Sequence, residues 1–213
     1  MKRNSKFIVI EGLDGSGKTT QTNILARRLE ADGHDVVIQA EPTPGQFGRL
    51  CREALGGRLD VSKSQLALLF TLDRIDHNKN PENGIDALLD KGKTIICDRY
   101  YYSTLAYQGV DVGMDWLKNI NLGCADIRKP DLVIFLDLEP QISLERITAN
   151  RDASEIEIYE NPDYLTKIRE RFREVLSMLD GENISVISAD DSIEAVADRI
   201  WECCAGNKFA AVQ

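Results

Sequence analysis

The chain has 213 residues, of which 43% are hydrophobic, and a formal net charge of −9. This length and composition suit one α/β domain with a substantial core, and no apolar run is long enough to cross a membrane. The acidic balance argues against a nucleic-acid binder, because such proteins carry a basic face. The five cysteines have no metal-ligand spacing and, being odd in number, make a poor disulfide framework. We therefore expect reduced thiols, a cytoplasmic protein, and no nucleic-acid or membrane partner.

Apolar runs alternate with helical patterns along the chain. In chain order they predict a strand at Phe7–Ile10, a helix from about Gly17 to Ala31, a strand at Val36–Ile38, a long helix after Ser62, a helix at Ala87–Lys91, strands at Thr94–Cys97 and Leu132–Leu136, helices at Ile142–Asn150 and Asp163–Leu179, a strand at Ile184–Ile187 and a helix at Ile193–Cys204. Gly33 is expected to end the first helix with a left-handed cap, and Gly84 to break or bend the long one. This rhythm predicts a doubly wound, five-stranded parallel sheet flanked by helices, in a single domain over residues 1–213.

Residues Gly12–Thr19 read Gly-Leu-Asp-Gly-Ser-Gly-Lys-Thr and directly follow the first apolar run. The octet has the spacing of a phosphate-binding loop and lies between a predicted strand and a predicted helix, as that loop requires. Its glycines allow consecutive backbone N–H groups to point at a polyphosphate. Lys18 would reach the outer phosphates, and the Thr19 hydroxyl would face a magnesium ion. The residues expected to hold a nucleoside triphosphate here are Gly12, Asp14, Gly15, Ser16, Gly17, Lys18, Thr19 and Thr20.

The segment 151–161 interrupts two predicted helices and has no clear apolar face. It is either a solvated connector or a lid that closes over the phosphates and excludes water, and the upstream phosphate loop favours a lid at about 150–161. Residues 206–213 are expected to form a short flexible tail.

A second motif, Asp98-Arg99-Tyr100, follows the third predicted strand. An aspartate at the carboxyl end of a parallel strand lies beside the phosphate loop, where it can hold magnesium or its water shell. Arg99 offers a planar fork for a phosphate. Alone, an Asp-Arg pair is also typical of a surface ion pair. Its position after a strand next to the phosphate loop makes Asp98 and Arg99 candidates for phosphoryl transfer.

Five motifs, taken together and in chain order, resemble those of the thymidylate kinase family. They are Ile10–Gln21, Glu41-Pro42-Thr43-Pro44-Gly45, Leu69–Arg74, Asp98-Arg99-Tyr100 with Tyr107-Gln108-Gly109, and Pro130–Asp137, and the resemblance covers about residues 6 to 200. It implies the P-loop fold of nucleoside monophosphate kinases. It also implies the phosphorylation of dTMP to dTDP for dTTP synthesis, with ATP as donor, Mg²⁺ as cofactor and a homodimeric assembly.

The resemblance assigns roles in the acceptor site to the matching residues. Phe70 would stack on the thymine ring, and Arg74, one helical turn later, would donate to the base O4. Gln108 has an amide that can pair with the N3–O4 edge of thymine, where one donor and one acceptor are needed. Tyr107 would crowd the sugar 2′ position, and Ser103 would add a polar contact.

The resemblance also assigns the residues nearest the transferred phosphate. Asp14 would engage the region of the acceptor's 3′-hydroxyl, and Arg99, with Arg49, would hold the acceptor phosphate in line with the donor γ-phosphate. Catalysis would then rest on positioning and charge neutralisation by Lys18, Asp14, Arg99 and one further arginine.

The chain departs from the family at two positions. Gly15 stands where some relatives carry an arginine in the phosphate loop, and Ala40 stands where many bacterial relatives carry one before the Glu-Pro motif. The expected lid is acidic apart from Arg151 at its start, so Arg151 is the candidate for neutralising charge on the transferred group and for contacting ATP. It is also readable as a helix-end arginine that complements the helix dipole.

Other functions remain open on the sequence. A kinase for another nucleotide or nucleoside, such as dUMP or a deoxynucleoside, shares the phosphate loop, although Phe70, Arg74 and Gln108 favour a thymine-type base. A GTP-driven switch needs Asn-Lys-x-Asp, and the string at 78–81 has proline in the last place. A non-catalytic P-loop relative that binds nucleotide is opposed by the intact Lys18, Thr19, Asp98 and Arg99.

Overall fold

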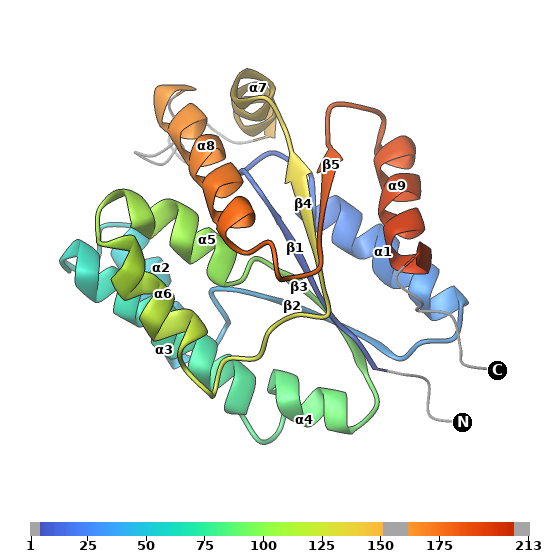
Figure 1. Ribbon diagram of the computed structural model, residues 1–213, viewed down its shortest axis with the longest axis horizontal. Coiled ribbons are helices and arrows are strands. Elements are labelled where there is room, and N and C mark those ends of the chain that lie inside the picture. The colour runs from blue at the N-terminus through green and yellow to red at the C-terminus, as the bar shows by residue number, and fades with distance from the viewer. Residues whose placement is uncertain (1–4, 151–161, 207–213) are drawn as a thin grey trace.

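A computed structural model of the chain describes residues 5–150 and 162–206. Arg151, the expected lid after Asn150 and the expected tail after Gly206 lie outside the described residues. Figure 1 shows a central sheet with helices on both faces, and the strands all run in the same direction.

The sheet has the doubly wound topology that the sequence predicts. Its five described strands are parallel and follow the order β2-β3-β1-β4-β5. They are β1 (Phe7–Gly12), β2 (Val36–Ala40), β3 (Thr94–Asp98), β4 (Leu132–Asp137) and β5 (Ile184–Ser188). The order reverses at β1, so the crevice at the carboxyl ends of β1, β3 and β4 is the expected place for a ligand.

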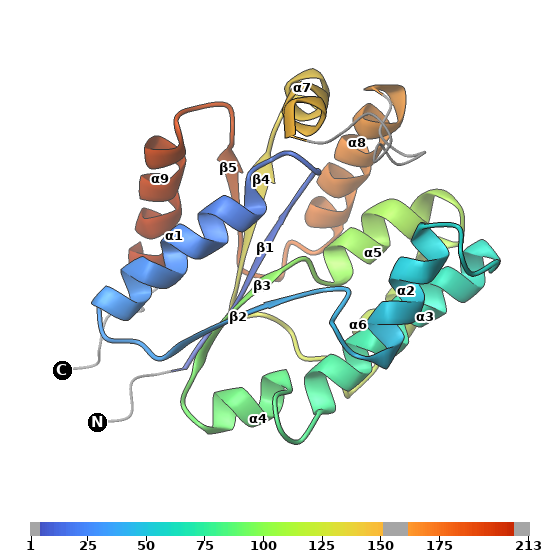
Figure 2. The ribbon, with the colours of Figure 1, turned by 180° about the vertical axis from the view of Figure 1, so that it is seen from behind.

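Alternate residues of β1 belong to two separate parts of the core. Phe7 and Val9 pack on the face that α5 (Tyr101–Tyr107) and α8 (Pro162–Met178) cover, while Ile8 and Ile10 pack on the face that α1 (Lys18–Ala31) and α9 (Ile193–Gly206) cover. Figures 1 and 2 show α1 beside α9 on this second face. Every residue of β1 is buried, as expected for a central strand of a parallel sheet with both faces covered.

The remaining helices lie in the segments that join β2 to β3, β3 to β4 and β4 to β5. They are α2 (Gln46–Leu55), α3 (Lys63–Lys79), α4 (Ile85–Asp90), α6 (Met114–Leu122) and α7 (Pro140–Asn150), with a short 3₁₀ turn at Gln108–Val110. None of the described helices has both the length and the apolar character that a membrane span needs.

The helix boundaries agree with the sequence signals at three positions. Ser62 caps α3, because its hydroxyl accepts from the Gln65 N–H while the Gln65 side chain accepts from the Ser62 N–H. Gly33 has a φ of 84°, as predicted for the left-handed residue after α1. Gly84 is the N-cap of α4, so the long helical stretch is indeed interrupted, although α3 already ends at Lys79.

The helices α2, α5 and α6 are not among the predicted elements. The residues of α5 are buried almost all around, so they show no apolar stripe of helical period. The helices α4 and α7 each begin two residues before their predicted start.

Candidate active site

The loop between β1 and α1 folds tightly around its glycines. The φ angles are 151° at Gly12, 74° at Gly15 and 91° at Gly17, a region that side chains disfavour. An added Cβ at Gly15 would also lie 2.7 Å from the Ser143 carbonyl oxygen of α7. Gly17 is the N-cap of α1, so the positive end of the helix dipole meets the loop. Such a loop is suited to hold a polyphosphate with backbone N–H groups.

Lys18 is the first residue of α1 and is only 7% exposed. Its Nζ donates to the carbonyl oxygens of Gly12, at 3.1 Å, and Leu13, at 2.8 Å. The same nitrogen lies 3.8 Å from the Asp14 carboxylate. Burial lowers the pKa of Lys18, Arg99 lowers it further, and Asp14 opposes the shift. The ammonium group is thus held inside the loop, within reach of a bound phosphate.

Thr19, at the start of α1, and Asp98, at the end of β3, bring two side-chain oxygens together. The Thr19 hydroxyl donates to Asp98 Oδ2 at 3.1 Å. The register pairs Ile10 of β1 with Asp98, which fixes this carboxylate at the carboxyl edge of the sheet. Magnesium in nucleotide sites is held by one or two such protein oxygens together with substrate phosphates, so this pair fits the ion. Of the other predicted loop residues, Ser16 is buried and Thr20 is exposed.

Arg99 links the phosphate loop to the helix that follows β3. It forms an ion pair with Asp14, donates to Ser103 Oγ at 2.9 Å and lies over the Tyr107 ring, 5.3 Å from its centroid. Burial alone would lower the pKa of Arg99, but Asp14, Tyr107, Glu11 and Asp98 together outweigh burial and raise the pKa well above its ordinary value. Arg99 also adopts a φ of 70°, which is uncommon for a residue other than glycine.

The Glu11 side chain accepts hydrogen bonds from the segment that follows Asp98 and Arg99. It is fully buried at the end of β1, and Oε1 accepts from the Tyr100 N–H at 2.7 Å and the Ser103 N–H at 3.2 Å. Its Oε2 accepts from the Ser103 hydroxyl at 2.6 Å. Burial raises the pKa of Glu11, although Arg99 and these hydrogen bonds oppose the shift. The buried carboxylate therefore fixes both the backbone and one side chain of the predicted acceptor site.

A cavity of about 230 Å³ opens next to Arg99. Seven of the eight predicted acceptor residues line it: Asp14, Phe70, Arg74, Arg99, Ser103, Tyr107 and Gln108. The eighth, Arg49, is exposed on α2 and is not among the lining residues. Residues of the lining that the sequence did not assign to the site include Glu41, Pro42, Leu55 and Tyr164.

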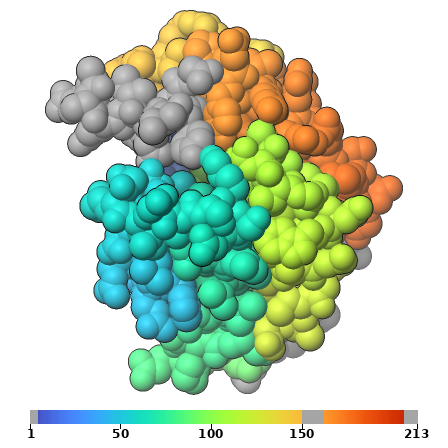
Figure 3. All heavy atoms as spheres, turned by 90° about the vertical axis from the view of Figure 1, so that its left-hand side faces the viewer, coloured from blue at the N-terminus to red at the C-terminus, as the bar shows by residue number. Residues whose placement is uncertain are grey.

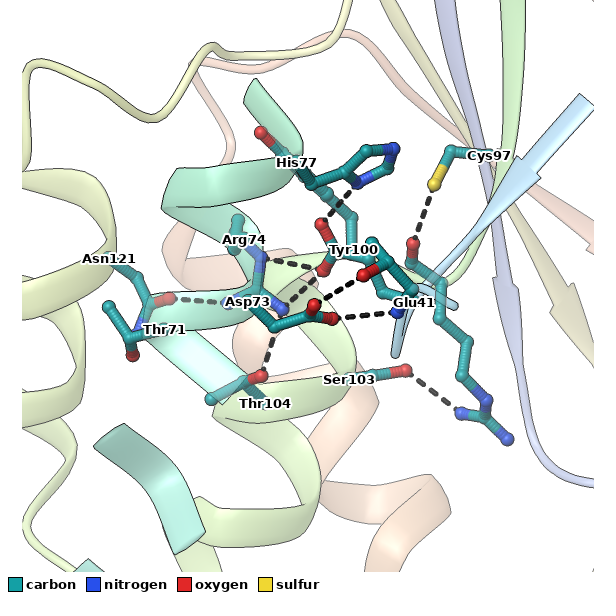
Figure 4. Close-up of polar contacts among 12 residues, drawn as sticks. Glu41, Thr71, Asp73, Arg74, His77, Cys97, Tyr100, Ser103, Thr104 and Asn121 are labelled. Carbon is teal, nitrogen blue, oxygen red and sulfur yellow. Dashed lines mark hydrogen bonds and ion pairs between the residues drawn. The ribbon is translucent and has the colours of Figure 1, made fainter. Parts of the chain in front are cut away.

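Arg74 is almost entirely buried in the wall of this cavity, with 1% of its surface exposed. Its Nε donates to Glu41 at 2.9 Å, and two further nitrogens donate to Asn121 Oδ1 at 2.5 Å and Thr104 Oγ1 at 3.1 Å (Figure 4). The guanidinium is therefore fixed from three other segments of the chain. Because it carries donors only, any ligand atom that meets it must be an acceptor.

The sequence model of the thymidylate kinase family matches residues 10–200. The chain belongs to the thymidylate kinase family. A Pyrococcus abyssi protein named "Probable thymidylate kinase" is 38% identical over 200 residues, which cover 91% of this chain and 93% of that protein. A Methanocaldococcus jannaschii protein of the same name is 35% identical over 199 residues, covering 92% of this chain and 94% of that protein.

Membership of the thymidylate kinase family accounts for how the five motifs come together. The phosphate loop, the Glu41–Gly45 segment, α3 and the Asp98-Arg99-Tyr100 turn all meet at the carboxyl edge of the sheet. The predicted roles of the individual residues stay predictions, and Arg151 lies outside the described residues.

Three residues that support the cavity from outside its lining also went unassigned in the sequence: Glu11, Asp73 and His77. Asp73 accepts from the Thr43 N–H at 2.7 Å and the Thr43 hydroxyl at 2.5 Å, and it thereby holds the segment after β2. For Glu11 the sequence did offer a signal, because an acidic residue stands at the end of an apolar run. The partners of Asp73 and His77 are 30 or more residues away in sequence, so no local pattern indicates them.

Proposed function

We propose that this chain transfers the γ-phosphoryl group of Mg-ATP to dTMP and forms dTDP, a step toward dTTP. The observation that carries the proposal is the Asp14–Arg99 ion pair, which connects the phosphate loop to the cavity next to it. The names of the relatives support thymidylate as the acceptor.

ATP, the phosphoryl donor, would bind at the phosphate loop. Its N–H groups would hold the β-phosphate, and Lys18 would move from its loop carbonyls to the β- and γ-phosphates. Magnesium, held by Thr19 and Asp98, would neutralise charge that develops on the phosphates. Arg151 remains our proposed second source of positive charge at the transferred group.

dTMP, the phosphoryl acceptor, would bind in the cavity. Phe70 lines it with a flat apolar face suited to a neutral base, and Arg74, also in the lining, would donate to the O4 acceptor of thymine. dCMP carries an amino group where dTMP carries O4. That amino group would face the Arg74 donors with a donor of its own, which disfavours dCMP. Gln108 would pair with the N3–O4 edge, and Tyr107 would exclude a 2′-hydroxyl. Arg99, aided by Ser103 and Arg49, would hold the acceptor phosphate.

The test is diphosphate formation from Mg-ATP with dTMP, dUMP, dCMP, dGMP, dAMP and UMP as acceptors, with thymidine tested for monophosphate formation. We expect strong preference for dTMP. A different preferred acceptor would keep a kinase but reject the proposed base contacts. ATP binding without acceptor-dependent turnover would reject the kinase and favour a nucleotide-binding relative.

We also propose a homodimer. The helices α3 and α6 contact one another, and large apolar side chains on them are exposed: Leu68 (42%) and Leu72 (44%) on α3 and Trp116 (37%) on α6. Figure 3 shows the segments of these two helices on one face of the molecule. Sedimentation analysis of the wild type and of Leu72→Arg tests this: we expect a dimer that the variant dissociates, and a monomeric wild type would reject it.

A cytoplasmic location completes the proposal. It is supported by the cysteines at 51, 97, 124, 203 and 204, all of which are free thiols in the described part of the chain. Free thiols suit a reducing compartment. Localisation of a tagged chain in its own cells would test this.

A further inference from the structure

His77 lies one turn after Arg74 on α3, is 6% exposed and does not line the cavity. It nevertheless shares a partner with Arg74. The two oxygens of Glu41 are divided between them: Oε2 contacts the Arg74 guanidinium at 2.7–2.9 Å, and Oε1 lies 2.9 Å from His77 Nδ1. Figure 4 shows both side chains reaching Glu41 from the same helix.

The other ring nitrogen of His77 also faces an acceptor. His77 Nε2 lies 2.9 Å from Gln39 Oε1. The Gln39 amide cannot be reversed, because its Nε2 donates to the Asn83 carbonyl oxygen at 2.8 Å and a reversal would place two oxygens together. With Glu41 ionised, as its contacts with Arg74 favour, a carboxylate oxygen on one side and an amide oxygen on the other call for an N–H at both ring nitrogens. The hydrogen bonds therefore describe an imidazolium.

The charges around His77 agree with this assignment. Glu41 after β2 and Asp73 on α3 interact with His77 directly, and Arg74, Cys97 and Tyr100 interact with Glu41. Burial raises the pKa values of Cys97 and Tyr100 well above their ordinary values, so neither carries charge near pH 7. Burial also raises the pKa of Asp73, but two donors of Thr43 support its carboxylate form.

With Glu41 and Asp73 both as carboxylates, the charges of Glu41, Asp73 and Arg74 sum to one negative charge. An unpaired buried charge is costly, and a cation in contact with Glu41 removes it. His77 is the remaining group that contacts Glu41 and can carry a positive charge.

We propose that His77 is a positively charged positioning residue for the acceptor base. By holding Oε1 of Glu41 it keeps Oε2 on Arg74, and Arg74 then keeps its donors at the cavity wall. This inference rests on the proposed function, since the base contact of Arg74 belongs to it. His77 thus contributes to discrimination between a base with an oxygen at position 4 and one with an amino group there.

The first experiment tests the charge and needs no turnover. The chain has only two histidines, so ¹⁵N-histidine labelling gives two sets of ring signals, and His34→Gln assigns them. We expect both ring nitrogens of His77 to carry protons at pH 7.5. One unprotonated ring nitrogen would overturn the proposal.

The second experiment tests positioning with His77→Gln, which keeps a donor for Glu41 but loses the charge. We expect the KM for dTMP to rise about tenfold, the scale of a buried charged hydrogen bond, with little change in the KM for ATP. The preference for dTMP over dCMP should fall as well. His34→Gln, which replaces the buried histidine after α1, is the matched control and should leave all three values unchanged.

Equal changes in both KM values, or an unchanged dTMP preference in a folded variant, would overturn the positioning role. If His77→Gln does not fold, Gln39→Leu removes the second acceptor instead and should give the same selective loss. A wild type that phosphorylates no nucleoside monophosphate would reject the proposed function and the specificity role with it. The ring protonation would still decide the charge of His77 independently.

Discussion

The guanidinium of Arg99 is paired with the carboxylate of Asp14, so a residue of the phosphate loop and a residue after β3 meet between the two halves of the site. The same guanidinium reaches Ser103 and the Tyr107 ring in the cavity. Arg99 is therefore anchored on the donor side and exposed to the acceptor side. This arrangement suits a group that must align two phosphates for in-line transfer.

Replacement of Arg99 by lysine is expected to keep the charge but lose the planar fork that serves Asp14 and Ser103 together. We expect kcat/KM for dTMP to fall by about 10²–10³, the usual loss when one positioned donor is removed. Steady-state kinetics with both substrates varied measures this. Arg27→Lys, at an exposed position of α1, is the control and should behave as the wild type.

Phe70→Ala is expected to raise the KM for dTMP and leave the KM for ATP nearly unchanged. Stacking of a base on an aromatic ring contributes about 1–3 kcal/mol, which corresponds to roughly 5- to 150-fold in affinity. Phe70→Tyr keeps the ring and should recover most of the affinity. Equal changes in the two KM values would show that Phe70 serves the core rather than the base.

Gly15→Ala is expected to destabilise the protein, because Gly15 combines a φ of 74° with a carbonyl oxygen 2.7 Å from an added Cβ. We expect a loss of about 2–4 kcal/mol in the free energy of unfolding, from left-handed strain and overpacking together. Gly92→Ala isolates the strain, since Gly92 has a φ of 82° but open space around it. Urea denaturation of both variants measures the difference, and equal losses would show that contact with α7 is unimportant.

Glu11→Gln is expected to change how stability depends on pH. Burial raises the pKa of Glu11 in the folded state, so its contribution to stability is fully present below the unfolded value of 4.5 and is lost as pH rises through the folded value. A glutamine keeps an oxygen for the Tyr100 and Ser103 N–H groups but does not ionise. The variant should therefore lose less stability than the wild type as pH rises from 4.5. Urea titrations at pH 5, 6, 7 and 8 test this, and parallel pH profiles would contradict it.

Features encoded by neighbouring residues could be predicted, and features encoded by distant partners could not. The three central strands follow from apolar runs that are buried on both faces, and the start of α3 follows from the Ser62–Gln65 reciprocal cap. The phosphate loop and seven of the residues that line the cavity follow from motif spacing and the family resemblance. The buried contacts of Glu41 with Arg74 and His77 join residues 33 and 36 positions apart, and only the folded chain brings them together.

Asp98 and Arg99 are adjacent in the chain, but their side chains face different parts of the site. Asp98 faces Thr19 at the proposed magnesium site, and Arg99 faces the cavity for the acceptor. A single peptide unit therefore separates the proposed metal contact from the proposed contact with the acceptor phosphate. The extended end of β3 and the left-handed turn at Arg99 direct the two side chains apart. A shift of β3 along the sheet would carry both side chains with it, so the proposed metal contact and the proposed acceptor contact would move together relative to the phosphate loop.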